Sequence, residues 1–174
     1  MSYQLIVLDG PSCVGKTQLA KELQKQLFDE VWLNFSIDTI VYTLPQMILD
    51  GCNYDNKWDT FDRNALLAGA FSCVQSLVNC GNKVIFDNIV STEHRANELL
   101  GYLTEFRVFY VGLTAEWECL EQRVNAREDR TLAEVMHGYE RTPKLLPYDI
   151  LVDTTQYDSE SVAREVIRAM KLKV

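Results

Sequence analysis

Basic residues are scarce in this sequence: 17 lysines and arginines stand against 25 aspartates and glutamates, and the formal net charge is −8. Proteins that bind a nucleic-acid backbone rely on clustered lysine and arginine, so this balance disfavours a nucleic-acid partner. A local concentration of positive charge does occur between Arg123 and Arg130. Because that cluster is too small for an extended binding face, we expect the partner to be a small molecule.

Histidine is scarce as well, and closely spaced cysteines are missing. The chain has two histidines and five cysteines, which are scattered and form no C-x-x-C pair. This composition excludes a Cys/His zinc site, because such a site needs several of these ligands at short spacings. We expect the cysteines to be reduced thiols, mostly buried as small apolar side chains, which is typical of a cytoplasmic protein.

Long apolar runs and linker-like stretches are also missing. No apolar run approaches 18 residues, and no basic region followed by an apolar one stands at the N-terminus. We therefore expect no membrane span and no secretion signal. With 174 residues, 47% of them hydrophobic, and no repeat or low-complexity tract, the sequence predicts one domain over residues 1–174. It leaves the oligomeric state open, a homo-oligomer included.

Short apolar runs alternate with helical patterns along the whole chain. The runs predict strands over residues 4–9, 31–38, 83–87, 106–113 and 150–153. The patterns between them predict helices over residues 16–28, 39–48, 63–80, 92–103, 115–127, 131–139 and 159–172, with an irregular segment over 51–62. This alternation predicts an α/β fold, a three-layer arrangement in which a parallel sheet carries helices on both faces.

One stretch matches the Walker A pattern G-x-x-x-x-G-K-[ST] in full, directly after the first predicted strand. Its residues are Gly10, Pro11, Ser12, Cys13, Val14, Gly15, Lys16 and Thr17. Glycines let backbone N–H groups converge on a phosphate, Lys16 adds a mobile positive charge, and the Thr17 hydroxyl is placed for Mg²⁺. The pattern predicts that the chain binds ATP with Mg²⁺ as a P-loop protein. The alternative is a glycine-rich turn without a ligand.

Acidic residues end two predicted strands, where ligands of such sheets bind. Asp38 follows the second strand and is our candidate for the base that accepts the proton of a substrate hydroxyl. Asp87 follows three apolar residues of the third strand and is our candidate for the Mg²⁺ contact. The alternatives are that Asp38 caps the following helix and that Asp87 shapes a turn.

Three arginines recur at helical intervals after the fourth strand: Arg123, Arg127 and Arg130. Arginines on one stripe neutralise a transferring phosphoryl group well, so we predict a lid over residues 123–131 that contacts the nucleotide. Arg130 is the candidate for the catalytic arginine of this lid, beside Lys16. The alternative is a salt-bridged surface helix, since acidic residues occur in the same segment.

Two further segments complete the predicted site. Asp153, Thr154 and Thr155 follow the last strand, and we expect this loop to lie against the adenine, although it could be a plain connection. The segment over residues 39–63 is expected on the acceptor side. Its aspartates leave Lys57 as the only cation between Asp50 and Asp62, which disfavours a phosphorylated acceptor.

With these residues in place, nearly the whole chain resembles the chloramphenicol phosphotransferase-like family of small P-loop kinases. The resemblance rests on residues 10–17, 32–39, 84–88, 111–112, 148–149 and 152–155 and on the arginine stripe. It implies ATP-dependent phosphorylation of a hydroxyl, with Asp38 as base and Arg130 stabilising the transferred group. The sequence departs from the family pattern at Asn88, where a second acid is expected, near Pro143, and over residues 47–63, so the acceptor stays open.

Two alternatives to a small-molecule phosphotransferase remain. A nucleoside or nucleotide kinase shares the P-loop and the arginine lid but would need cations for its acceptor. A nucleotide-binding switch, which signals through a partner, usually needs a glutamine near the metal to position water, and no glutamine follows Asp87 before Gln122.

Overall fold

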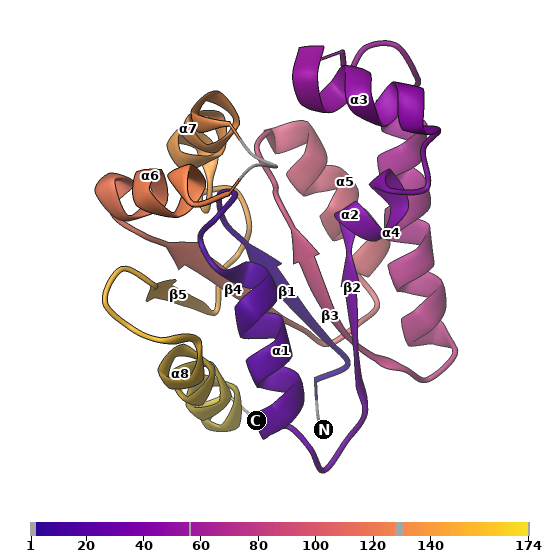
Figure 1. Cartoon of the computed structure of the whole chain (residues 1–174). Helices are drawn as coiled ribbons and strands as arrows, with labels where there is room; N and C mark the ends of the chain where they lie inside the picture. Colours follow the sequence, from indigo (N-terminus) through magenta and orange to yellow (C-terminus); the bar gives the residue numbers. More distant parts are fainter. Residues whose placement is uncertain (1–2, 56, 128–130, 174) are drawn as a thin grey trace.

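A computed structural model describes residues 3–55, 57–127 and 131–173 of the chain (Figure 1). Its strands are β1 (Leu5–Asp9), β2 (Trp32–Ser36), β3 (Lys83–Asn88), β4 (Val108–Thr114) and β5 (Ile150–Asp153). They form one sheet in the order β2-β3-β1-β4-β5, and every neighbouring pair is parallel. Because all strands run the same way, their carboxyl ends meet at one edge of the sheet, where β1 leads into the Walker A loop.

Helices cover both faces of this sheet, which confirms the predicted α/β fold. They are α1 (Lys16–Gln26), α2 (Ile37–Val41), α3 (Gln46–Asp55), α4 (Arg63–Asn79), α5 (Glu93–Leu103), α6 (Trp117–Asn125), α7 (Leu132–Arg141) and α8 (Ser159–Leu172). At the carboxyl edge, α6 and α7 lie toward one end, and α2 and α3 toward the other (Figure 1). None of the described helices is both long and apolar enough to cross a membrane.

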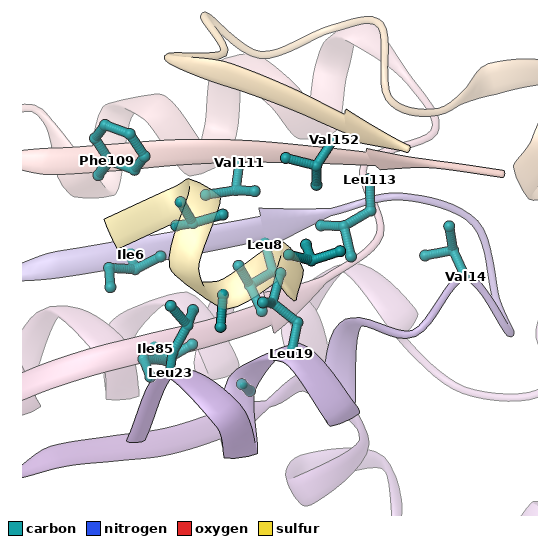
Figure 2. Close-up of a cluster of buried hydrophobic side chains, with 14 of the residues drawn as sticks. Ile6, Leu8, Val14, Leu19, Leu23, Ile85, Phe109, Val111, Leu113 and Val152 are labelled. Atoms are coloured by element: carbon teal, nitrogen blue, oxygen red, sulfur yellow. The ribbon is translucent and has the colours of Figure 1, made fainter. Parts of the chain in front are cut away.

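The sheet separates two hydrophobic cores, and strand periodicity assigns residues to them. Ile6 and Leu8 of β1 belong to the core beneath α1 and α8, which Figure 2 shows, whereas Leu5 and Val7 belong to the core beneath α4 and α5. All four side chains are fully buried. An apolar residue at every position of β1 is therefore what a central parallel strand requires, because successive side chains enter opposite cores.

The segment after β2 departs from the prediction. Asp38 does not end the strand but is the second residue of α2, because Ser36 caps that helix: its hydroxyl accepts from the Asp38 N–H at 3.2 Å, and the Ser36 N–H donates to the Thr39 hydroxyl. The alternative that Asp38 itself is the cap is wrong. The single helix predicted over 39–48 is two helices, and the second, α3, begins directly after Pro45, where proline is tolerated.

Two other expectations need correction. Residues 51–55 of the predicted irregular segment belong to α3, so the irregular part is shorter than expected. The five cysteines are all free, as predicted, but only Cys52 is buried, whereas Cys73 and Cys80 are exposed on α4 and just after it. Most of the thiols are therefore surface or partly buried groups and contribute little to the core.

Candidate active site

The loop between β1 and α1 owes its shape to its two glycines. A side chain at Gly10 would place its Cβ 2.6 Å from the carbonyl oxygen of Leu113 on β4, so only glycine fits there. Gly15 has a φ of 104°, a left-handed conformation that residues with a Cβ rarely adopt. It is also the N-cap of α1, and because it has no capping side chain, the first N–H groups of the helix can bind an anion.

Lys16 and Thr17 connect this loop to the neighbouring strand β3. The Lys16 ammonium donates to the carbonyl oxygens of Gly10 and Pro11, both at 2.9 Å, and lies 4.0 Å from a carboxylate oxygen of Asp87. The Thr17 hydroxyl donates to the other Asp87 oxygen at 2.8 Å. The structure thus brings together three residues that the sequence assigned to phosphate and metal binding.

Burial raises the pKa of the Asp87 carboxyl above its usual value. The positive charge of Lys16 and the hydrogen bond from Thr17 oppose this rise, and the negative charge of Asp38 adds to it. Asp38, an exposed residue of α2, follows β2, whose last residue, Ser36, is the register partner of Asp87 on β3. The charge of the candidate base, Asp38, therefore affects the pKa of the candidate metal ligand, Asp87.

Thr17 and Asp87 suit a magnesium ion that also binds water and phosphate better than they suit a metal bound only by protein side chains. Over the described ranges, no group of three or more His, Cys, Asp or Glu side chains could hold a metal ion. Magnesium usually keeps several waters and takes one or two protein oxygens together with substrate phosphates. The hydroxyl and carboxylate oxygens of this bonded pair fit that pattern, and they would hold the ion beside the P-loop.

A cavity of about 600 Å³ opens beside the loop. Its walls come from the loop, from Arg123 and Arg127, and from Thr154, Tyr157 and Val162 after β5. Thr154 was part of the predicted adenine loop, and it lines this cavity; its contact with an adenine stays a prediction. This arrangement places a space of nucleotide dimensions directly against the phosphate-binding backbone.

The other two residues of the predicted adenine loop have different tasks. The Asp153 carboxylate accepts from the Thr155 N–H at 2.7 Å, and the Thr155 hydroxyl accepts from the Glu116 N–H at 2.8 Å. These bonds shape the loop and tie it to the start of α6. The cavity is instead completed by Tyr157, Asp158 and Ser159, which sequence reasoning missed because only the packing of α8 brings them to the loop.

Arg123 lines the cavity but is bound mainly by the protein itself. Its guanidinium donates to the Thr154 carbonyl at 2.6 Å, to the Thr154 hydroxyl at 3.1 Å, and more weakly to the carbonyls of Cys13 and Val14. The Thr154 hydroxyl in turn donates to Val14 at 2.8 Å. Arg123 therefore fastens α6 to both the P-loop and the β5–α8 segment, and this positions the walls of the cavity.

The predicted lid is described in part. Arg127 lies at the cavity, just beyond α6. Arg130, the predicted catalytic arginine, lies outside the described residues. On the far side of that segment, α7 packs against the loop, and a Cβ at Gly138 would come within 3.3 Å of the Pro11 Cα. The helix after the predicted lid is thus in direct contact with the Walker A residues.

Asp9 is a second buried carboxylate at this edge that the sequence did not single out as a site residue. It is fully buried and accepts from the Tyr148 hydroxyl at 2.6 Å and from the Val90 N–H at 2.7 Å. Burial raises the pKa of Asp9, and the hydrogen bonds from Tyr148 and Val90 oppose this rise. Asp9 thereby joins the end of β1 to the segments that follow β3 and precede β5.

Asn88, where the family pattern leads one to expect an acid, is buried at the end of β3. Its Oδ1 accepts from the Ile89 N–H at 2.8 Å, while its Nδ2 has no hydrogen-bond partner within the described part of the chain. A buried amide without a partner is costly, so this donor is available to a ligand at the carboxyl edge.

The chain also spells the purine-selective pattern N-K-x-D at Asn56-Lys57-Trp58-Asp59. Its described residues, 57–59, lie between α3 and α4, and none of them lines the cavity beside the P-loop. The pattern therefore gives no support to a nucleotide-binding switch.

The sheet order and the loop together define a P-loop protein with the kinase fold. The sequence model of chloramphenicol phosphotransferase-like proteins matches residues 3–171, and the chain belongs to this family. This confirms the resemblance that the motifs had indicated. A comparison with curated protein sequences finds no significant match.

Solved structures of similar shape include kinases that act on different compounds. An unliganded sugar kinase from a Janibacter species has a TM-score of 0.74 at 13% identity, over 97% of this chain and 95% of that one. The APS kinase of Mycobacterium tuberculosis, in complex with AMPPNP and APS, has a TM-score of 0.70 at 17% identity, over 98% of both chains. Shikimate kinase from Acinetobacter baumannii, in complex with shikimate, has a TM-score of 0.64 at 16% identity, over 98% and 94%. At such low identities, the structural similarity establishes the shared fold and nothing more. Together with family membership, this shared fold supports a small-molecule kinase.

Proposed function

We propose that this protein transfers the γ-phosphate of ATP to a hydroxyl group of a small molecule. The observation that carries the proposal is the contact of Lys16 and Thr17 with Asp87 at the carboxyl edge, beside β2, whose Ser36 pairs with Asp87 and leads into the helix of Asp38. A turn that binds no ligand gives no reason for a lysine, a hydroxyl bonded to a carboxylate, and a second, exposed carboxylate to lie at the same edge of the sheet. Phosphoryl transfer to an alcohol needs each of them.

Each group has a defined task in this proposal. The loop N–H groups and Lys16 would hold the β- and γ-phosphates, and Thr17 and Asp87 would hold a magnesium ion, which would supply positive charge against the triphosphate. Asp38 takes the proton of the acceptor hydroxyl as its oxygen forms a bond to the γ-phosphorus. The bond from that phosphorus to the β,γ-bridging oxygen breaks, and ADP leaves. Arg130 would neutralise the transferred group, a role that follows from the family pattern.

Contacts of Arg123 and Arg127 with the cavity support their placement beside the nucleotide. The exposed Tyr157 ring at the same cavity offers an aromatic surface for the base. We further propose a cytoplasmic location, which agrees with five free thiols.

A screen for ATP-dependent products tests the proposal. The purified protein, ATP and magnesium are incubated with hydroxyl-bearing metabolites and antibiotics, chloramphenicol among them, and products are detected by mass spectrometry. We expect a phosphorylated product that requires both ATP and the hydroxyl. The same reactions with the Lys16→Ala variant serve as the control and should yield none. Release of ADP without any phosphorylated compound across the panel would contradict the proposal and favour hydrolysis.

A further inference from the structure

The first turns of α4 and α5 lie side by side at the carboxyl edge. Asp62 caps α4 by accepting from the Ala65 N–H, and Thr92 caps α5 by accepting from the Arg95 N–H. Arg95, in the first turn of α5, donates to the side-chain oxygen of Asn64 in the first turn of α4. Both helices therefore begin at the edge that carries the P-loop, and α2, the helix of Asp38, packs against α4.

Two arginines lie near the junction of these turns. Arg95 pairs with Glu98 at 2.5 Å and, through Asn64, reaches the residue next to Arg63. The Arg63 guanidinium lies over the Trp58 ring, 5.2 Å from its centroid. Within the described part of the chain, Arg63 has no carboxylate partner. Of these two arginines, only Arg95 has a carboxylate partner among the described residues, and that partner is Glu98.

The surroundings of Arg63 leave its positive charge poorly compensated. Partial burial lowers the pKa of Arg63, and the positive charge of Arg95 lowers it further. Beside the guanidinium, the rings of Trp58 and Phe61 contact each other with centroids 6.5 Å apart and form an apolar surface. Guanidinium groups next to an aromatic ring suit a ligand that carries a carboxylate or a phosphate on an organic molecule.

We propose that Arg63 and Arg95, with Trp58, form a subsite for an anionic group, a carboxylate or a phosphate, on the acceptor molecule. This inference rests on the proposed function, since it concerns the acceptor of the same transfer. It also changes the expectation drawn from the sequence. The segment between Asp50 and Asp62 offers a single lysine, but α5 brings Arg95 from beyond β3 to Asn64, the neighbour of Arg63 in the chain.

Steady-state kinetics with pairs of acceptors, one anionic and one neutral but otherwise alike, test this subsite. The protein is offered hydroxy acids beside their methyl esters, and sugar phosphates beside the free sugars. We expect the anionic member of a pair to be phosphorylated preferentially. The Arg63→Gln variant should lower kcat/KM for that member about ten- to a hundredfold, mainly through KM, and leave the KM for ATP unchanged. Arg63→Lys should restore part of the loss, because it keeps the charge but not the planar fork.

A binding measurement tests the subsite without turnover. The chain has three tryptophans, so the indole N–H signal of Trp58 can be followed by NMR and assigned with Trp58→Phe. Magnesium and AMPPNP are kept saturating, so that the P-loop cannot bind the added anion. Titration with glycerate or inorganic phosphate should shift the Trp58 signal, while glycerol should not. The shift should vanish in Arg63→Gln and persist in Arg164→Gln, which removes the same charge from an exposed arginine on α8.

The two experiments separate the possible failures. If neither anion moves the Trp58 signal, or if Arg63→Gln responds like the parent, the anionic subsite is wrong, whatever the turnover result. If a neutral compound is the preferred acceptor and Arg63→Gln leaves its kcat/KM unchanged, the subsite is also wrong, but the phosphotransferase stands. If the anions bind through Arg63 and no compound is phosphorylated, the anion site stands and the proposed function fails.

Discussion

The carboxyl edge has two parts in the proposed function: a donor side around the P-loop, and an acceptor side around α2 and the start of α4. The two differ in the contacts that their polar groups make within the protein. On the donor side, Lys16, Thr17 and Arg123 each bind neighbouring atoms of the protein, and Lys16 is largely buried. On the acceptor side, Asp38 lies at an exposed position of α2, and the Arg63 guanidinium, which lies over the Trp58 ring, has no carboxylate partner in the described ranges. The donor side is thus preorganised by its own backbone, which suits a cosubstrate common to many kinases. The acceptor side is left to be completed by the compound that binds there.

The largest effect should follow from Lys16→Ala, which removes the cation of the donor side. We expect kcat to fall by about a thousandfold, because Lys16 is the only cation in the sequence from Gly10 to Thr17. The fold should survive, since among the described residues the ammonium contacts its own loop and Asp87 alone. Steady-state kinetics and circular dichroism check this. A variant that retained turnover would show that the loop is not the donor site.

On the acceptor side, Asp38→Ala should lower kcat at least about a hundredfold, because the hydroxyl proton would lose its acceptor. Binding of ATP should stay close to that of the parent, since Asp38 lies on α2 and does not line the cavity beside the loop. Asp38→Asn, which keeps the shape without the charge, is the matched variant. Turnover by Asp38→Ala equal to that of the parent would exclude this residue as the base.

A smaller effect is expected for Arg123→Ala, which loosens the donor side without removing a phosphate ligand. Loss of its hydrogen bonds to Thr154 and the loop should raise the KM for ATP roughly tenfold and lower the free energy of unfolding by about 1–3 kcal/mol. Arg164→Ala is the control, because it removes an exposed arginine paired with Glu160. Nucleotide titration and thermal unfolding measure both quantities. Equal changes in the two variants would contradict the anchoring role of Arg123.

The smallest effect concerns stability and pH at Asp9. Since burial raises the pKa of this carboxyl in the folded protein, the folded state holds the proton more tightly than the unfolded state does. The contribution of this proton to stability is therefore fully present below the unfolded pKa of 3.8 and is lost as pH rises through the folded pKa. Between the two pKa values, the loss amounts to about 1.4 kcal/mol for each pH step of one.

Asp9→Asn removes this titration. The variant should gain stability relative to the parent as pH rises from about 4 toward 7, which denaturant unfolding at several pH values would measure. A difference that stayed constant over this range, or changed in the opposite direction, would show that the pKa of Asp9 is not raised.

Sequence reasoning succeeded where a short segment carries its own geometry. The Walker A pattern, the apolar β1 and the strand-end Asp87 were all placed correctly, because close backbone packing and strand periodicity act over a few residues. It failed at Asp38, because the Ser36–Thr39 capping pair starts a helix at Ile37, two residues earlier than predicted. It also missed Tyr157, Arg63 and Arg95, which lie near side chains from segments far apart in the chain.

The sequence by itself therefore determined the kinase fold and the donor loop, since hydrophobic periodicity and two glycines with a lysine and a threonine specify both locally. Only the tertiary structure decided which distant side chains meet at that loop. Packing of α6 and α8 brings Arg123 to Thr154, and packing of α5 against α4 brings Arg95 toward Arg63. The physical reason is that long-range contacts depend on how whole helices are placed on the sheet, and no local pattern encodes that placement.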